Sequence, residues 1–346
     1  MKKIANLLIF ITFLGFALSN IITLPLIQSQ KDGLVVNVKY GTQECSKNMR
    51  VQNYYFCTTQ LRQDPEHDNC GVTKMDYDEN FEGYDYNAQL ILDATQFNMK
   101  ITIPDYVINY YNQNVFCLAP TINVRNSSNP VVELYNQKLI QNQQFYFYIK
   151  DLTYTNPIDT VVGAMHIGQP DMSVVKPGSK VYQLRSHNDN NNFSISGSKK
   201  FRYDGESITF SYTTLKLSYG YYLSYFTNSF TIDCITFDGL IKVFKKKGLK
   251  FTQKQKYEIY FQSLEGLGNF EFDLHLESGQ YFTVTFTPEE MTALQQDGTY
   301  YLRMTESIGT TASIGYQIFN KYYIGFNLDG YSQLIAERAD HQAQQS

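Results

Sequence analysis

The chain has 346 residues, enough for two ordinary domains or for one two-lobed β unit. Its 43% hydrophobic and 18% charged residues describe a globular protein and exclude a disordered one. A net charge of -4 and a sequence pI near 5.8 argue against a nucleic-acid partner, which requires a basic face. The 29 Tyr and 24 Phe favour strands, because aromatic side chains suit a half-buried pleated surface.

Residues 1–19 have the pattern of a secretory signal peptide. Lys2 and Lys3 form its charged start, 4–16 its apolar core, and 17–19 (Ala-Leu-Ser) a small-x-small cleavage site. The alternative, an uncleaved anchor, is disfavoured because the core is short for a membrane span. No later apolar run approaches the length of a span, so we expect no stable membrane span. The protein is expected to be secreted or to lie in the lumen of the secretory or endolysosomal pathway.

Short strands are predicted along most of the chain after the signal. Apolar and polar residues alternate in 35–40, 145–149 and 270–276, as in a sheet with one buried face. Gly, Asn and Asp separate these runs and indicate turns. Helical signals are few. Residues 287–294 predict one or two turns of helix, with a Thr cap, Pro at the first position and acidic residues in the first turn.

A boundary between two halves of similar size is predicted in the Pro-, Gly- and Asn-rich stretch 169–192. No repeat of 20–50 residues is visible, which excludes solenoids and propellers. The expected organisation is a signal peptide at 1–19, an N-terminal β lobe at 20–180, a C-terminal β lobe at 181–340 and a disordered tail at 341–346.

Five cysteines follow the expected signal peptide. In an oxidising compartment, the four in the first half predict two disulfides, for which three pairings remain open. The fifth, Cys234, has no His or basic neighbour in the sequence, so we expect a buried, inert thiol. The four disulfide candidates are Cys45, Cys57, Cys70 and Cys117.

No metal site is expected. Residues 76–87 begin like a calcium loop, but Phe81 occupies position six, which needs Gly, and Asn87 occupies position twelve, which needs Glu. The five His are not spaced as zinc ligands. Asn126 and Asn192 each begin an Asn-x-Ser acceptor for glycosylation, which fits a secreted glycoprotein.

The second half carries a family resemblance. In 313–328, Ser-Ile-Gly leads into Phe, Tyr-Tyr and Phe, and this is similar to the closing segment of pepsin-like aspartic proteases. The run Phe-Thr-Ile-Asp-Cys-Ile-Thr around Asp233 resembles the catalytic motif of that family. Asp233 and Gly315 are 82 positions apart, about the family's separation between its catalytic Asp and the glycine beneath it. The segment 272–291 resembles a strand, Gly turn, strand and Pro-led helix, so the resemblance covers roughly 231–337.

The first half resembles the family at three places. Residues 23–26 are similar to the mature start, and 37–43 to the strand that ends in Gly-Thr. Residues 157–164 are similar to an Asp-Gly-Ile-Leu-Gly-Leu strand. Gly163 and Gly315 each follow two apolar or small residues, as expected if the two halves are the related lobes of this family.

Two alternatives place the first catalytic loop. In one, 57–59 (Cys-Thr-Thr) stands for Asp-Thr-Gly, so Cys57 replaces the acid. In the other, 93–95 (Asp-Ala-Thr) does, which keeps the acid and loses the glycine. We favour the first, because it follows Gly41 at closer to the family's distance. It leaves Asp93 in the strand after the flap, where the family often has an Asp.

The chemistry of this family needs two carboxylates that share one proton and hold one water. Neither half keeps an intact Asp-Thr/Ser-Gly, because Ile235 and either Thr59 or Thr95 occupy the glycine positions. A β-branched side chain there crowds the loop. The motif residues that remain are Cys57, Thr58, Thr59, Cys234, Thr236, Gly163 and Gly315.

The resemblance implies an all-β, two-lobed pepsin-like acid-protease barrel fold with few short helices and no cofactor. We expect a non-catalytic protein that binds an extended polypeptide or other protein ligand in the cleft between its lobes. One alternative is an active, divergent aspartic endopeptidase that uses Asp233 with Asp93 at acid pH. Another is a secreted structural β protein of a different family.

Overall fold

A computed structural model describes most of the chain after residue 20. The described residues are 21–29, 33–42, 45–52, 59, 61, 70, 72–78, 83–104, 114–118, 129–150, 159–186, 194–196, 200–209, 214–217, 230–306, 311–315 and 317–340. The expected signal peptide at 1–19, the tail at 341–346, Cys57, Thr58, Asn126 and Asn192 lie outside them.

Strands dominate both halves of the described chain. The first half contains β1 (Ile22–Ser29), β2 (Gly33–Tyr40), β3 (Cys45–Gln52), β4 (Thr73–Asp78), β5 (Gly83–Leu92), β6 (Thr95–Pro104), β7 (Val115–Cys117), α2 (Pro130–Asn136), β8 (Gln144–Ile149) and β9 (Thr160–Ile167). The second half contains β10 (Tyr182–Gln183), β11 (Ser194–Ser196), β12 (Lys200–Tyr203), β13 (Glu206–Thr209), β14 (Thr214–Leu217), β15 (Phe230–Ile232), α3 (Cys234–Lys246), β16 (Phe251–Gln253), β17 (Ile259–Phe261), β18 (Phe270–His275), β19 (Tyr281–Phe286), α4 (Pro288–Met291), β20 (Thr292–Leu294), β21 (Tyr300–Leu302), β22 (Met304–Glu306), β23 (Thr311–Ile314), α5 (Gln317–Lys321), β24 (Tyr322–Asn327) and β25 (Ser332–Glu337). The prediction of an all-β protein with few short helices is confirmed.

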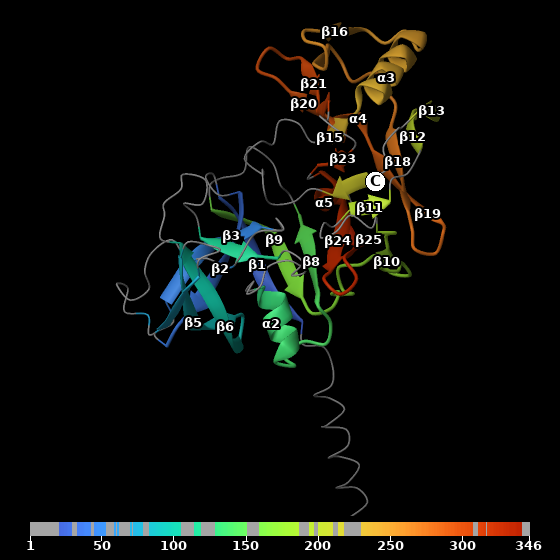
Figure 1. Cartoon of the computed structure of the whole chain (residues 1–346). Coiled ribbons are helices and arrows are strands. Elements are labelled where there is room, and N and C mark those ends of the chain that lie inside the picture. The colour runs from blue at the N-terminus through green and yellow to red at the C-terminus, as the bar shows by residue number, and fades with distance from the viewer. Residues whose placement is uncertain are drawn as a thin grey trace, which may run out of the picture.

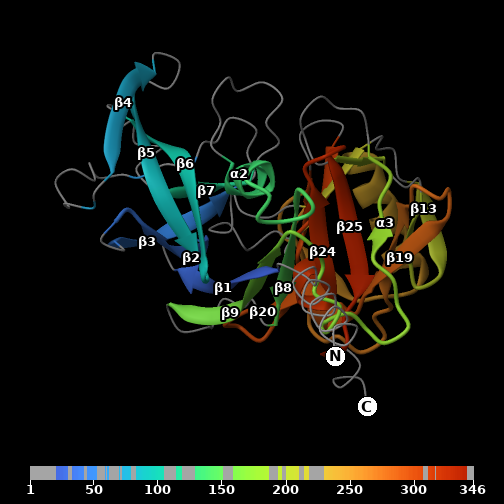
Figure 2. The same ribbon diagram turned by 90° about the horizontal axis from the view of Figure 1, so that it is seen from below.

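One sheet of 12 strands joins the two halves (Figure 1). Its order is β10-β25-β24-β8-β9-β1-β2-β3-β7; β5 also pairs with β2, and β4 and β6 pair with β5. The C-terminal hairpin β24–β25 therefore lies beside β8, with Phe326 opposite Phe145. In Figures 1 and 2 the first-half strands lie on one side of this junction and most second-half strands on the other.

Three smaller sheets build the rest of the second half. Their orders are β11-β14-β23-β15-β22, β13-β12-β18-β19 and β16-β17-β21-β20. In the first of them, β14 pairs with β23 and β15 with β22 in parallel, whereas β15 and β23 are antiparallel. Among the described strands of the first half, β3 pairs with β7 in parallel.

Large aromatic side chains fill the core of both halves. Phe230, Phe272 and Phe286 pack together in the second half, with Phe230 stacked on Phe272 at 5.5 Å between ring centroids. Phe145 stacks on Phe326 at 5.1 Å across the junction of β8 and β24. Burying such rings is the main favourable term in folding, and the offset contacts add to it. The largest core cluster includes residues from both halves.

The predicted helix near 287–294 is present in part. α4 spans Pro288–Met291, and Thr287 and Glu290 form a capping box in which each side chain accepts from the other's backbone N–H. The chain then turns into β20 instead of continuing as helix. The strand, Gly turn, strand and Pro-led helix expected over 272–291 appear as β18, Gly279, β19 and α4.

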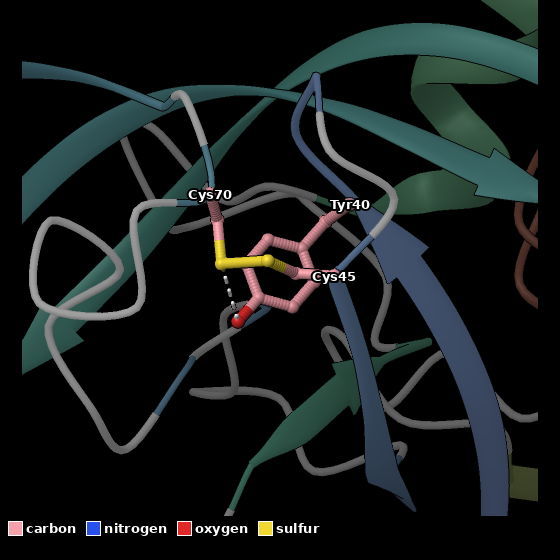
Figure 3. The surroundings of a disulfide bond; sticks show 3 residues. All are labelled: Tyr40, Cys45 and Cys70. Atoms are coloured by element: carbon pink, nitrogen blue, oxygen red, sulfur yellow. Dashed lines mark hydrogen bonds between the residues drawn. A yellow bond between two sulfur atoms is a disulfide. The ribbon is translucent and has the colours of Figure 1, made fainter.

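One disulfide ties the turn after β2 to a later segment of the first half. Cys45 and Cys70 are bonded, with their Cα atoms 5.7 Å apart, and the hydroxyl of Tyr40 lies 3.7 Å from the sulfur of Cys70 (Figure 3). Gly41 has φ 73°, and a Cβ there would overlap the carbonyl oxygen of Cys70. Only glycine combines that φ with so close an approach.

Two further cysteines, Cys117 and Cys234, lie in the described residues. Cys117 is disulfide-bonded, and its partner lies outside the described residues. Cys234 is a free thiol, but it is half-exposed rather than buried as expected, because it occupies the first turn of α3. No helix within the described ranges is long and apolar enough to cross a membrane.

Candidate functional site

Asp233 lies at the junction of β15 and α3 and is the N-cap residue of that helix. Its Oδ1 accepts a hydrogen bond from the backbone N–H of Thr236 at 2.7 Å. Its Oδ2 lies 2.7 Å from the hydroxyl of Thr236, which also lies 3.0 Å from the carbonyl oxygen of Thr209. A hydroxyl has one proton to donate, so an ionised Asp233 and Thr209 compete for it. The carboxylate therefore has a structural task at the start of α3.

The chain around Asp233 differs from the predicted strand and loop, because α3 begins at the next residue. Phe237, Leu240, Ile241 and Phe244 recur at helical spacing and are buried. Ile235 lies on the other side of the first turn and is 60% exposed. The first turn thus presents an apolar side chain beside an acid.

Gly315 does not lie beneath Asp233 as the resemblance implies. β15 and β23 are antiparallel, with Phe230 opposite Ile314 and Thr231 opposite Ser313. Gly315 follows Ile314, so the register places it at the start of β15, whereas Asp233 follows the end of that strand. Gly163 lies in β9 of the 12-stranded sheet, where a Cβ would overlap the backbone of β8. Gly315, in contrast, directly follows β23 of the five-stranded sheet.

Asp93, the candidate acid of the first half, does not lie near Asp233. Asp93 and Ala94 form the two-residue turn between β5 and β6, where Asp93 is exposed with φ 55°. An Asp tolerates that left-handed conformation in a hairpin turn. Figures 1 and 2 place this hairpin and α3 on opposite sides of the molecule.

Thr59 is buried in the first half, where it contacts β6 and β7. Its carbonyl oxygen accepts from the backbone N–H of Thr102 in β6 at 3.0 Å. Its hydroxyl oxygen accepts from the backbone N–H of Cys117 in β7 at 3.4 Å. These contacts connect two strands, which is a structural role. Thr95, the alternative residue for the glycine position, starts β6 after the hairpin turn.

Comparison with protein-family models and with curated proteins finds no match for this chain. The functional interpretation therefore depends on the arrangement of the chain's own residues. Among the described residues, no three His, Cys, Asp or Glu side chains are placed to hold a metal ion.

A buried polar cluster that the sequence did not predict lies on the outer face of the 12-stranded sheet. His166 of β9 is 3% exposed, and its Nδ1 lies 2.7 Å from the hydroxyl of Tyr323 in β24. That hydroxyl oxygen accepts from the backbone N–H of Asp171 at 3.1 Å. Nε2 of His166 lies 4.0 Å from a carboxylate oxygen of Asp171. Tyr146 of β8 stacks on Tyr323 and closes the cluster.

Acidification is expected to weaken the fold through His166. Burial lowers the pKa of His166 below its ordinary value of 6.5, and the charge of Asp171 only partly opposes this shift. Because the folded state then binds fewer protons than the unfolded chain, the stabilisation is complete above pH 6.5 and is lost as pH falls below it. We expect the melting temperature of His166→Gln to fall by less than that of the parent when the pH is lowered from 7.5 to 5.5.

Asp171→Asn is the matched variant for this measurement. Among the described residues, Asp171 is the charge that favours protonated His166. The variant should therefore lose more melting temperature on acidification than the parent. If the melting temperature fell equally on acidification in the parent, His166→Gln and Asp171→Asn, other groups would govern the pH dependence of stability.

Two further buried cations anchor the closing strands. Lys321 of α5 lies 3.0 Å from Glu290 of α4. Arg338, which is 3% exposed, follows β25 and donates to the carbonyl oxygens of Ile149, Phe319 and Asn320. These pairs are 18 to 189 positions apart in the sequence, so periodicity alone cannot indicate them.

Proposed function

We propose that this chain is a secreted protein of pepsin-like, two-lobed fold that binds an extended polypeptide between its lobes and does not cleave it. The fold part of the proposal is supported by the sheet that joins the halves and by the parallel pairs β3 with β7 and β15 with β22. In the second half, β15 (Phe230–Ile232) leads directly to Asp233, the acid of the motif.

The position of the acids is the observation that carries the non-catalytic part. Aspartic proteolysis requires two carboxylates close enough for repulsion to split their pKa values. Asp93 lies in an exposed hairpin turn on the far side of the molecule from α3. Asp233 caps α3 through Thr236. A single capping carboxylate does not supply an acid and a base at the same pH.

The first turn of α3 has the features of a binding surface. Ile235 exposes a large apolar side chain beside the half-exposed Asp233 and Cys234. Extended peptides bind through backbone pairing, while pockets for alternate side chains provide selectivity. An apolar ligand side chain would pack against Ile235, and a ligand N–H would donate to a remaining lone pair of the Asp233 carboxylate.

Peptidase assays should therefore be negative. We expect no cleavage of an unfolded protein by the purified chain between pH 3 and pH 6, with or without a transition-state-like inhibitor. Cleavage that the inhibitor blocks and that Asp233→Asn abolishes would overturn the proposal in favour of an active endopeptidase. Asn is suited to the N-cap position, so Asp233→Asn should leave α3 intact.

Binding is tested with an immobilised library of extended peptides. We expect Ile235→Asp to lower the affinity for the selected peptides by at least tenfold, since a new carboxylate replaces the apolar contact. Leu294→Asp is the matched control, because Leu294 is similarly exposed, at 67% against 60% for Ile235, but lies on β20. An equal loss of peptide affinity in both variants would contradict a binding site at α3. A library from which no peptide is selected would contradict it as well.

A further inference from the structure

The C-terminal end of α3 carries a concentration of positive charge in an acidic protein. Five exposed lysines lie within nine positions: Lys242, Lys245, Lys246, Lys247 and Lys250. We call these five the lysine end of α3. Without them, the chain keeps 24 basic residues against 33 acidic ones, a net charge of -9.

Helical spacing places the first three of these lysines on one side of α3. Lys245 and Lys246 lie three and four positions after Lys242, so the three lysines share a face. The opposite face, which includes Phe244, is packed into the core. In Figure 1, α3 lies at the end of the second half farthest from β24 and β25.

Part of this charge is paired within the protein. Lys246 lies 3.1 Å from Glu206, and Lys247 lies 2.5 Å from Asp204, both acids belonging to the β12–β13 hairpin. Lys242, Lys245 and Lys250 form no ion pair with any residue in the described ranges. The negative end of the helix dipole favours lysines in the last turn. It does not account for Lys242 or for Lys250, which lies beyond the helix.

We propose that the lysine end of α3 is a binding surface for an acidic polysaccharide. Lysine ammonium groups are point charges without the fork geometry of arginine, and they suit a partner with diffuse, repeated anionic groups. A sulfated or carboxylated glycan chain has this chemistry.

Two other polyanions fit less well. A membrane-binding helix inserts an apolar face, but that face of α3 is in the core. Between Ile235 and Tyr281 no large hydrophobic side chain is exposed in this continuously described stretch. Anionic lipid of the cytoplasmic leaflet and nucleic acid lie on the other side of the membrane from a protein with the expected secretory signal.

The test is binding of the purified full-length chain to immobilised heparin, with uncharged dextran as the negative matrix. The triple variant Lys242→Gln, Lys245→Gln and Lys250→Gln removes the three lysines without ion pairs. At about 1 kcal/mol for each lysine near an anionic surface, we expect binding to weaken roughly 100-fold. The parent's affinity should also fall steeply with salt.

The matched control changes the same number of exposed lysines elsewhere, at Lys39, Lys150 and Lys180. The control should bind heparin like the parent, within a factor of about three by additivity of distant sites. Equal losses in the two triple variants would overturn the proposal, because net charge alone would then explain binding. It would also be overturned by no binding at 50 mM salt, or by equal binding to duplex DNA or to vesicles with 30% phosphatidylserine.

Discussion

Replacing Arg338 by methionine is expected to lower the free energy of unfolding by about 3–5 kcal/mol. Nη1 of the buried guanidinium lies within hydrogen-bond distance of the carbonyl oxygens of Ile149, Phe319 and Asn320 and shares its two N–H donors among them. It also pairs with Asp340 at 2.7 Å and lies over the ring of Tyr148 at 4.6 Å. Methionine fills much of the volume but leaves the carbonyl oxygens without this donor, and each such loss costs about 1–3 kcal/mol.

Two variants separate the buried contacts from the surface ion pair. Arg338→Lys keeps the charge but not the fork of donors, so it should lose most of the same stability. Asp340→Asn changes only the half-exposed partner and should cost less than about 1 kcal/mol. Urea unfolding measures all three. A cost below about 1 kcal/mol for Arg338→Met would show that the carbonyl oxygens find other donors.

Removal of the Cys45–Cys70 disulfide is expected to have an effect of similar size. The two residues are separated by 25 positions, and a closed loop of that length corresponds to about 3.5 kcal/mol in the chain-entropy model. The double variant Cys45→Ala and Cys70→Ala should lose this amount in urea unfolding without reductant. Using a variant instead of reductant leaves the bond at Cys117 intact.

Cys234→Ala is the matched control for this prediction, because Cys234 is the free, half-exposed thiol. Its substitution should change stability by less than about 0.5 kcal/mol, as for a surface position. If the double variant were as stable as this control, the turn at Gly41 would be held by its backbone contacts rather than by the disulfide.

Patterns within single segments predicted much of the fold. The alternation at 35–40 and 270–276 identified β2 and β18, because the apolar residues at every second position of these runs are buried. The Thr-Pro-Glu-Glu signal identified α4 through a capping box that is local in sequence. Such features depend on neighbours a few positions apart, so the sequence contains all the information that they need.

α3 was missed for an identifiable reason. Cys234–Lys246 contains Thr, Val, Ile and a glycine, which lower helix propensity, and the resemblance assigned its start to a catalytic loop. The signal was nevertheless present. Asp233 is a good cap, and Phe237, Leu240, Ile241 and Phe244 follow at helical spacing.

The relations between distant segments were not predictable from one sequence. His166 and Tyr323 are 157 positions apart, and their contact depends on the strand order β24-β8-β9. The opposite positions of Asp93 and α3 likewise depend on how the sheets are arranged. A motif identifies an acid, but the register of its strand decides which residues surround it.

The place of β24 and β25 constrains how this protein is made. β8 pairs with β24, so one edge of the first-half sheet has no neighbour until residues near 327 leave the ribosome. Vectorial folding from the N-terminus then stops short of a finished domain, and the exposed edge of β8 is a site for mispairing during synthesis. Loss of the last 25 or so residues, at a premature stop codon for example, would remove the neighbour of β8 and Arg338 together.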